Sequence, residues 1–155
     1  MAVDTIDIKD TFEYVADVVE DFKKIEFHEA LDQIADVFVD TTRENFLTKS
    51  SPSGIPWLPL SPVTVARKGH DTILVDSTTM RKSVVLRDAP HHIERMGKNA
   101  SGEDEIVFGT DVNYAVFHQE GTSKTPQREF LGLEEKDVDE IADIVADHIV
   151  EKLKK

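Results

Sequence analysis

The segment TKSSPSGIPWLPLSPVTVARKGH, residues 48–70, decides the architecture because it separates two regions of different pattern. It contains four prolines, two glycines and four serines in 23 residues. Neither a helix interior nor a central strand can continue through such a sequence, because proline fixes its own φ and has no main-chain N–H to donate. We therefore predict a flexible, extended loop over about residues 48–72, with one short helix from Pro62 to Lys68 that Ser61 caps.

Two amphipathic helices are predicted before this loop. Apolar residues recur at steps of three and four from Asp10 to Lys24, and again from about Glu26 to Leu47. This spacing places them on one face of a helix, which then needs a partner surface. The second helix is the longer of the two.

Short elements are predicted after the loop. A helical turn at Met80 and Arg81 gives way to β-branched residues, which predict a strand near Ser83 to Ala89. Two further runs, 91–97 and 105–110, flank a tip rich in Gly, Asn and Ser, as the two strands of a hairpin do. Together these runs predict a small antiparallel sheet of three or more strands.

The chain is predicted to finish with two helices. A short one covers Asp111 to Glu120, with Gly121 in the position of a helix C-cap. A long one begins near Glu134, with acids in its first turn and lysines in its last, as the helix dipole favours. The order of elements predicts an α+β fold in a single domain of residues 1–155: two N-terminal helices, a Pro-rich extended loop, a small antiparallel sheet and a long C-terminal helix.

Composition excludes several classes of protein. The net charge is −13, from 31 acidic and 18 basic residues, so the field of the molecule repels nucleic acid and sequence-specific binding to it is not expected. The chain has no cysteine, which excludes disulfides, zinc ribbons and thiol catalysis. No stretch approaches the roughly 18 apolar residues of a membrane span. The N-terminal residues MAVDTIDIKD lack a signal-peptide pattern, so we expect a cytoplasm-like compartment and no membrane.

The stretch NYAVFHQEGTSKTPQREFLGL, residues 113–133, raises the question of catalysis, because it holds a His, a Glu and an Arg around a glycine turn. His118 and Glu120 are two residues apart on a predicted helix and point in different directions. His91 and His92 are adjacent on a predicted strand and face opposite ways, which disfavours a shared metal. Nucleophile elbows and phosphate-binding loops are absent. We predict no enzyme activity, no cofactor and no metal, and a structural hydrogen-bonding role for His118.

Two other residues are candidates for a structural or binding role. Arg128 follows a proline on a loop and is expected to form an ion pair that fastens the loop, although an anion clamp is the alternative. Trp57 lies between prolines. Either it anchors the loop on the protein's own core, or it contacts a partner.

Three stretches, taken in order, resemble the phage virion morphogenesis family, a Mu-like group tied to tail completion and head–tail joining. They are GIPWLPLSPVTVARK, ILVDSTTMRKSV and VFGTDVNYAVFHQEGTSKTPQREFLGL, and the resemblance covers about Phe46 to Leu133. The positions that carry it include Gly54, Trp57, Leu60, Ser61, Thr64, Lys68, Gly109, Thr110, Tyr114, Ala115, His118, Gln119, Gly121, Pro126, Arg128, Phe130, Leu131 and Gly132.

The resemblance implies a non-enzymatic assembly protein that acts in tail completion or head–tail joining at the neck. Relatives at such junctions form rings, commonly of six copies, so the implied partners are further copies of the chain and other phage neck and tail proteins. The implied location is the virion neck or tail, and the host cytoplasm during assembly. Alternatives are a tail-tube terminator or minor tail component, a metal hydrolase that uses His118 with His91 or His92, and an acidic inhibitor that mimics DNA.

On this interpretation residues 114–133 form a packed corner. Tyr114, Phe117, Phe130 and Leu131 are its predicted apolar anchors, Gly121 supplies the turn, and Arg128 ties the loop down. The full set of predicted structural or interface residues is Trp57, Leu60, Tyr114, Phe117, His118, Gly121, Arg128, Phe130 and Leu131.

Overall fold

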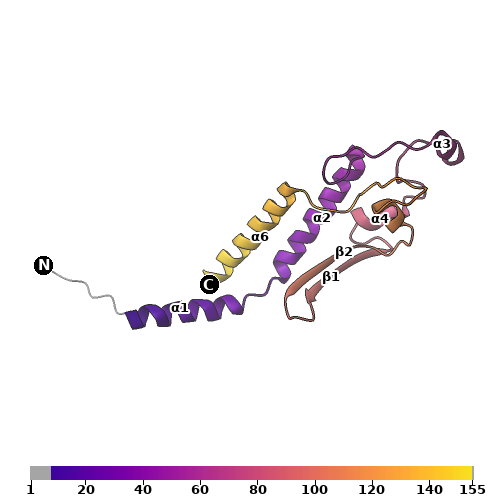
Figure 1. Cartoon of the computed structure of the whole chain (residues 1–155). Coiled ribbons are helices and arrows are strands. Elements are labelled where there is room, and N and C mark those ends of the chain that lie inside the picture. The colour runs from indigo at the N-terminus through magenta and orange to yellow at the C-terminus, as the bar shows by residue number, and fades with distance from the viewer. Residues whose placement is uncertain (1–7, 155) are drawn as a thin grey trace.

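The computed structural model describes residues 8–154 of the chain, and their side chains from residue 13 onward. The elements are α1 (Ile8–Lys23), α2 (His28–Thr48), α3 (Pro62–Lys68), α4 (Thr79–Val85), β1 (His92–Lys98), β2 (Asp104–Thr110), α5 (Ala115–Gln119) and α6 (Glu135–Leu153). The predicted α+β class is confirmed (Figure 1). None of the helices in the described residues is both long and apolar enough to cross a membrane.

Helix α2 is the central element of the molecule. It packs against the antiparallel α6 on one side, and against α4 and the hairpin on the other (Figure 1). Its buried side chains therefore occupy more than one face: Ala30, Leu31, Ile34, Ala35, Val37, Val39, Thr41, Thr42, Asn45 and Phe46. In contrast, α1 projects away from this body and contacts α6.

The sheet within the described residues has two strands rather than three. The predicted hairpin is confirmed: β1 and β2 pair antiparallel, with His92 opposite Thr110 and Lys98 opposite Asp104. The predicted strand near Ser83 to Ala89 is wrong, because residues 79–85 form helix α4. Met80, Ser83 and Val84 are all buried, and their spacing of three and four residues is that of a helical face.

Local capping signals set the other boundaries. Helix α3 spans the predicted residues, and Ser61 Oγ accepts a hydrogen bond from the N–H of Thr64 at 3.2 Å. Helix α6 begins with a reciprocal capping box between Glu134 and Asp137. Glu120 is the C-cap of α5, and Gly121 comes one residue later with φ +76°.

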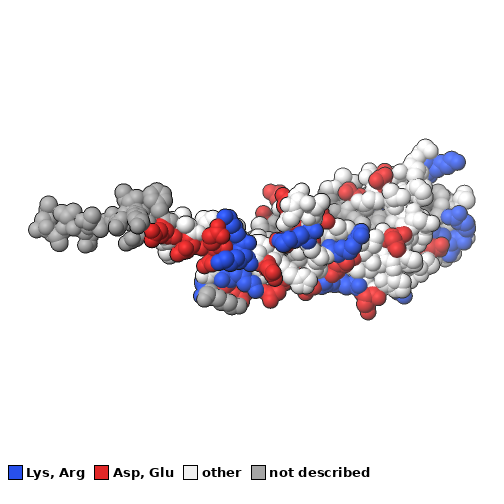
Figure 2. Space-filling model, turned by 90° about the horizontal axis from the view of Figure 1, so that it is seen from below, with Lys and Arg blue, Asp and Glu red and all other residues white. Residues whose placement is uncertain are grey.

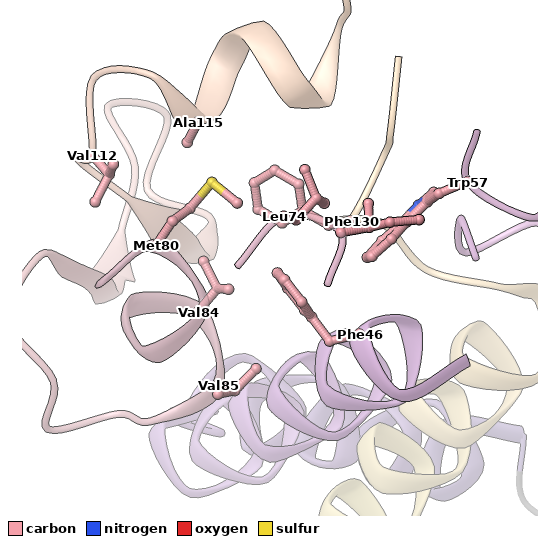
Figure 3. Packing of buried hydrophobic residues seen from close by; sticks show 10 residues of the cluster. Phe46, Trp57, Leu74, Met80, Val84, Val85, Val112, Ala115 and Phe130 are labelled. Atoms are coloured by element: carbon pink, nitrogen blue, oxygen red, sulfur yellow. The ribbon is translucent and has the colours of Figure 1, made fainter. Parts of the chain in front are cut away.

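The main hydrophobic core lies beside the C-terminal half of α2 (Figure 3). It consists of Phe46, Trp57, Ile73, Leu74, Met80, Val84, Val85, Val112, Ala115 and Phe130. Half of these residues come from segments without regular structure, so the loops before α3, α4, α5 and α6 are part of the core. The start of the Pro-rich loop is fixed in the same way, since the N–H of Trp57 donates to the carbonyl of Lys49 at 2.8 Å.

Candidate functional site

Trp57 packs into the protein's own core. Its exposed fraction is 6%, its ring meets Phe46 edge-on at 5.5 Å, and its Nε1–H donates to the carbonyl of Glu129 at 2.8 Å. Of the two interpretations left open by the sequence, the structure therefore shows the intramolecular anchor. Through this one side chain the Pro-rich loop is joined to the segment that precedes α6.

Phe130 is the centre of the corner. It is fully buried and lies 5.9 Å from the ring of Phe46. Leu131 and Leu60 are half-buried and pack on the same cluster. The prediction that all four apolar residues anchor the corner is wrong for two of them, because Tyr114 and Phe117 are 40% and 54% exposed.

Gln119 holds the corner together, a role that its place in the family motif does not predict. Its Oε1 accepts from the N–H groups of Phe130 and Leu131, both at 3.1 Å. Its Nε2 donates to the carbonyl of Leu131 at 2.7 Å. One side chain at the end of α5 thus satisfies the main chain of the segment on which Phe130 lies.

Arg128 joins the corner to the Pro-rich arm, by which we mean residues 58–68. Its Nε donates to the carbonyl of Leu58 at 2.8 Å and its Nη2 to that of Pro59 at 3.1 Å, while its own N–H donates to the carbonyl of His118 at 2.7 Å. These hydrogen bonds replace the expected ion pair, since no carboxylate pairs with Arg128 among the described residues. Burial lowers the pKa of this guanidinium, which is 5% exposed.

The side chain of His118 makes no hydrogen bond within the described residues, so the predicted hydrogen-bonding role is wrong for its ring. The buried Nδ1 has no partner, and the ring lies edge-on to Tyr114 at 6.4 Å. Burial, together with the charges of Arg128 and Lys68, lowers the pKa of this imidazole below its ordinary value. The two cations therefore favour the neutral form of this ring.

His91 and His92 form hydrogen bonds with different partners. His91 Nδ1 bonds Asp111 at 2.7 Å, whereas His92 Nδ1 bonds the carbonyl of Ser83 at 2.8 Å. Among the side chains that the structure describes, from residue 13 to 154, no group of three or more His, Asp or Glu is placed to hold a metal ion. The metal-hydrolase alternative therefore has no ligand set in the described part of the chain.

Gly121 provides a test of how tightly the corner closes. Its φ is +76°, and a Cβ atom built there would lie 2.8 Å from the main-chain N of Gln127. Gly102, at the hairpin tip, has φ +80° but nothing within 4 Å of the same atom. Gly102→Ala therefore incurs only the left-handed strain of about 1–2 kcal/mol. Gly121→Ala adds a steric clash of about 1–3 kcal/mol.

Urea denaturation of the two glycine variants measures this difference. We expect Gly121→Ala to lower the free energy of unfolding by at least about 1 kcal/mol more than Gly102→Ala does. Equal losses would show that the loop of residues 122–127 moves aside, and that the corner is not closely packed.

A cationic groove of about 790 Å³ opens between the arm, the start of α4 and the corner. Its charged lining residues are Arg67, Lys68, Lys124, Arg128 and Asp76, or four cations against one acid. None of the four cations forms an ion pair within the described residues. Figure 2 shows Lys and Arg at this end of the molecule, and a second basic cluster beside the end of α1.

At the opposite end, α1 presents an apolar face with no cover from the described chain. Tyr14, Val15, Val18, Val19 and Phe22 are between 37% and 70% exposed. They recur at helical spacing and so lie on one side of α1.

Comparison with known proteins supports one assignment. No curated protein and no solved structure matches the chain. The model of the phage virion morphogenesis family matches residues 3–150, so the match extends beyond the sequence resemblance to the helices on both sides. Because it covers nearly the whole chain, the chain belongs to the phage virion morphogenesis family.

Proposed function

We propose that this protein is a non-enzymatic structural component that forms a homo-oligomeric ring at the end of the phage tail, where it completes the tail or joins it to the head. The family indicates a role in phage structure or assembly. The ring and its position at the tail end are our inference. A tail-tube terminator remains the main alternative within the same class.

The observation that carries the proposal is the exposed face of α1. Fully burying one large apolar side chain stabilises a protein by about 1.5–3 kcal/mol. Covering the five partly exposed residues of this face would therefore stabilise a contact with another subunit. Helix α1 also projects from the body, which makes its face accessible to another subunit (Figure 1). A contact between two different surfaces of identical chains produces a ring when the rotation closes.

Substitution of Val19 tests whether the exposed face of α1 forms a subunit contact, and Val138 on α6 is the matched control. Val19 and Val138 are both on helices and are 46% and 53% exposed. Glutamine is a better helix former than valine, so Val19→Gln leaves α1 helical while its apolar face is interrupted. We expect it to weaken each subunit contact by about 1 kcal/mol or more, or about fivefold in dissociation constant. Val138→Gln should have no such effect.

Light scattering across a concentration series measures the mass of each variant, and complementation of a phage that lacks this gene measures assembly. Negative-stain images should show filled heads beside separate tails for the deletion, and joined particles after wild-type or Val138→Gln protein is supplied. Tails of abnormal length would favour the terminator instead. A wild-type protein that stays monomeric at every concentration, or normal particles without the gene, would contradict the proposal.

A further inference from the structure

We infer that the exposed face of α1 binds in the cationic groove of a neighbouring copy of the same chain. This inference rests on the self-association proposed above and names the two surfaces that meet. It commits to one occupant of the groove, a second copy of this protein, and to one segment of that copy, α1.

Charge is the first argument for this pairing. Helix α1 has five carboxylates and two lysines, a net charge of −3. The groove lining has four cations and one carboxylate, a net charge of +3. In a chain whose total charge is −13, most surfaces repel a second copy, and the groove is a local exception.

Apolar complementarity is the second argument. Beside its cations, the groove is lined by Leu60, Val75 and Tyr114. Tyr114 is 40% exposed, while Leu60 and Val75 are half-buried, so the groove retains apolar surface that a ligand can cover. The apolar face of α1 supplies matching side chains, with the carboxylates of the same helix able to reach the cationic rim.

The shape of the molecule is the third argument. Helix α1 and the arm that carries α3 lie at opposite ends of an elongated chain (Figure 1). Figure 2 shows acidic side chains along α1, with a basic cluster next to them, and further Lys and Arg at the far end of the molecule. As the chain is folded, α1 cannot enter the groove of its own copy, whereas a neighbour in a head-to-tail arrangement presents one surface to the other.

The alternative arrangement, α1 against α1, is less favourable. It brings together two helices that each have a net charge of −3 and therefore repel each other. It also leaves the unpaired cations of the groove uncovered in the assembly. Both arrangements bury the apolar face of α1, but the charges favour the groove.

Cross-linking between single cysteines tests the pairing directly, because the natural chain contains none. One protein has Val19→Cys on α1, and a second, enlarged by a small fusion tag, has Ser77→Cys at the exposed edge of the groove. The matched control is Ser101→Cys at the hairpin tip, which is also exposed. The two proteins are mixed, treated with a short bis-maleimide and separated on a denaturing gel, while light scattering of the same mixtures reports whether oligomers are present.

We expect a cross-linked band of mixed mass from Val19→Cys with Ser77→Cys, and none from Val19→Cys with Ser101→Cys. Oligomers that give no mixed band, or a band joining two Val19→Cys chains alone, would overturn the inference and leave the proposed ring intact. Monomers in every mixture would overturn both. A bond formed within one chain carrying both cysteines, at high dilution, would show that α1 folds back on its own groove and would also overturn it.

Discussion

Phe130→Ala is expected to lower the free energy of unfolding by about 3–5 kcal/mol, the usual cost of removing a buried phenylalanine ring. Phe130 is fully buried and lies between Phe46 of α2 and the segments that carry Trp57 and Leu74 (Figure 3). Removing its ring leaves a cavity at the point where these separate parts of the chain meet. A domain of ordinary stability retains only about 5–15 kcal/mol in total, so this is a large fraction of the whole.

The single tryptophan makes the measurement direct. Trp57 is buried in the same cluster, so its fluorescence reports the unfolding of this core during urea titration. Phe117→Ala is the matched control, because it removes the same atoms from a residue that is 54% exposed. We expect a change within about 0.5 kcal/mol for the monomer. Similar losses in both variants would show that burial in this cluster does not determine stability.

The elements with local boundary signals could be predicted from the sequence. The start of helix α3 could be predicted because Ser61 and Pro62 act within the first turn of the helix. The hairpin and α6 were recognised for the same reason, through a turn-rich tip and charged helix ends. In each case the decisive interaction joins residues close in sequence.

Helix α4 could not be predicted in this way. Val84 and Val85 favour a strand by local preference, yet both are buried in the core in a helical conformation. The packing of α4 against α2, from a distant part of the sequence, overrides the local preference. Two adjacent β-branched residues in so short a run do not distinguish these two outcomes.

In the candidate site too, features set by the local sequence could be predicted, and features set by distant parts of the chain could not. Gly121 was placed correctly because a turn needs a left-handed residue at that point. The exposure of Phe117 could not be predicted, because a five-residue helix does not define its buried side by periodicity alone. The groove could not be predicted from the sequence, because residues far apart in the chain, such as Lys68 and Lys124, line it together only in the folded structure.

Arg128→Ala is expected to lower the free energy of unfolding by about 1.5–3 kcal/mol, the range for hydrogen bonds made by a charged group. The substitution removes both side-chain bonds to the carbonyls of Leu58 and Pro59. These bonds join the corner to the arm, so the arm should loosen more than the core. Hydrogen exchange is therefore expected to rise in residues 58–68 and to stay slow in α2. Arg67→Ala is the control, because Arg67 is exposed and has no such bonds in the described structure.

Arg128→Lys separates the charge of this residue from its geometry. A lysine keeps the positive charge, but its single ammonium group does not reproduce the planar arrangement of Nε and Nη2 that reaches two successive carbonyls. We expect Arg128→Lys to lose stability and arm protection nearly as much as Arg128→Ala. If lysine restored both, the charge alone would hold the arm, and the two hydrogen bonds would not be the cause of its position. Because the arm forms one wall of the groove, we expect both variants also to weaken ring formation. If a variant stays folded with a loosened arm and still assembles normally, the groove is not part of the subunit contact.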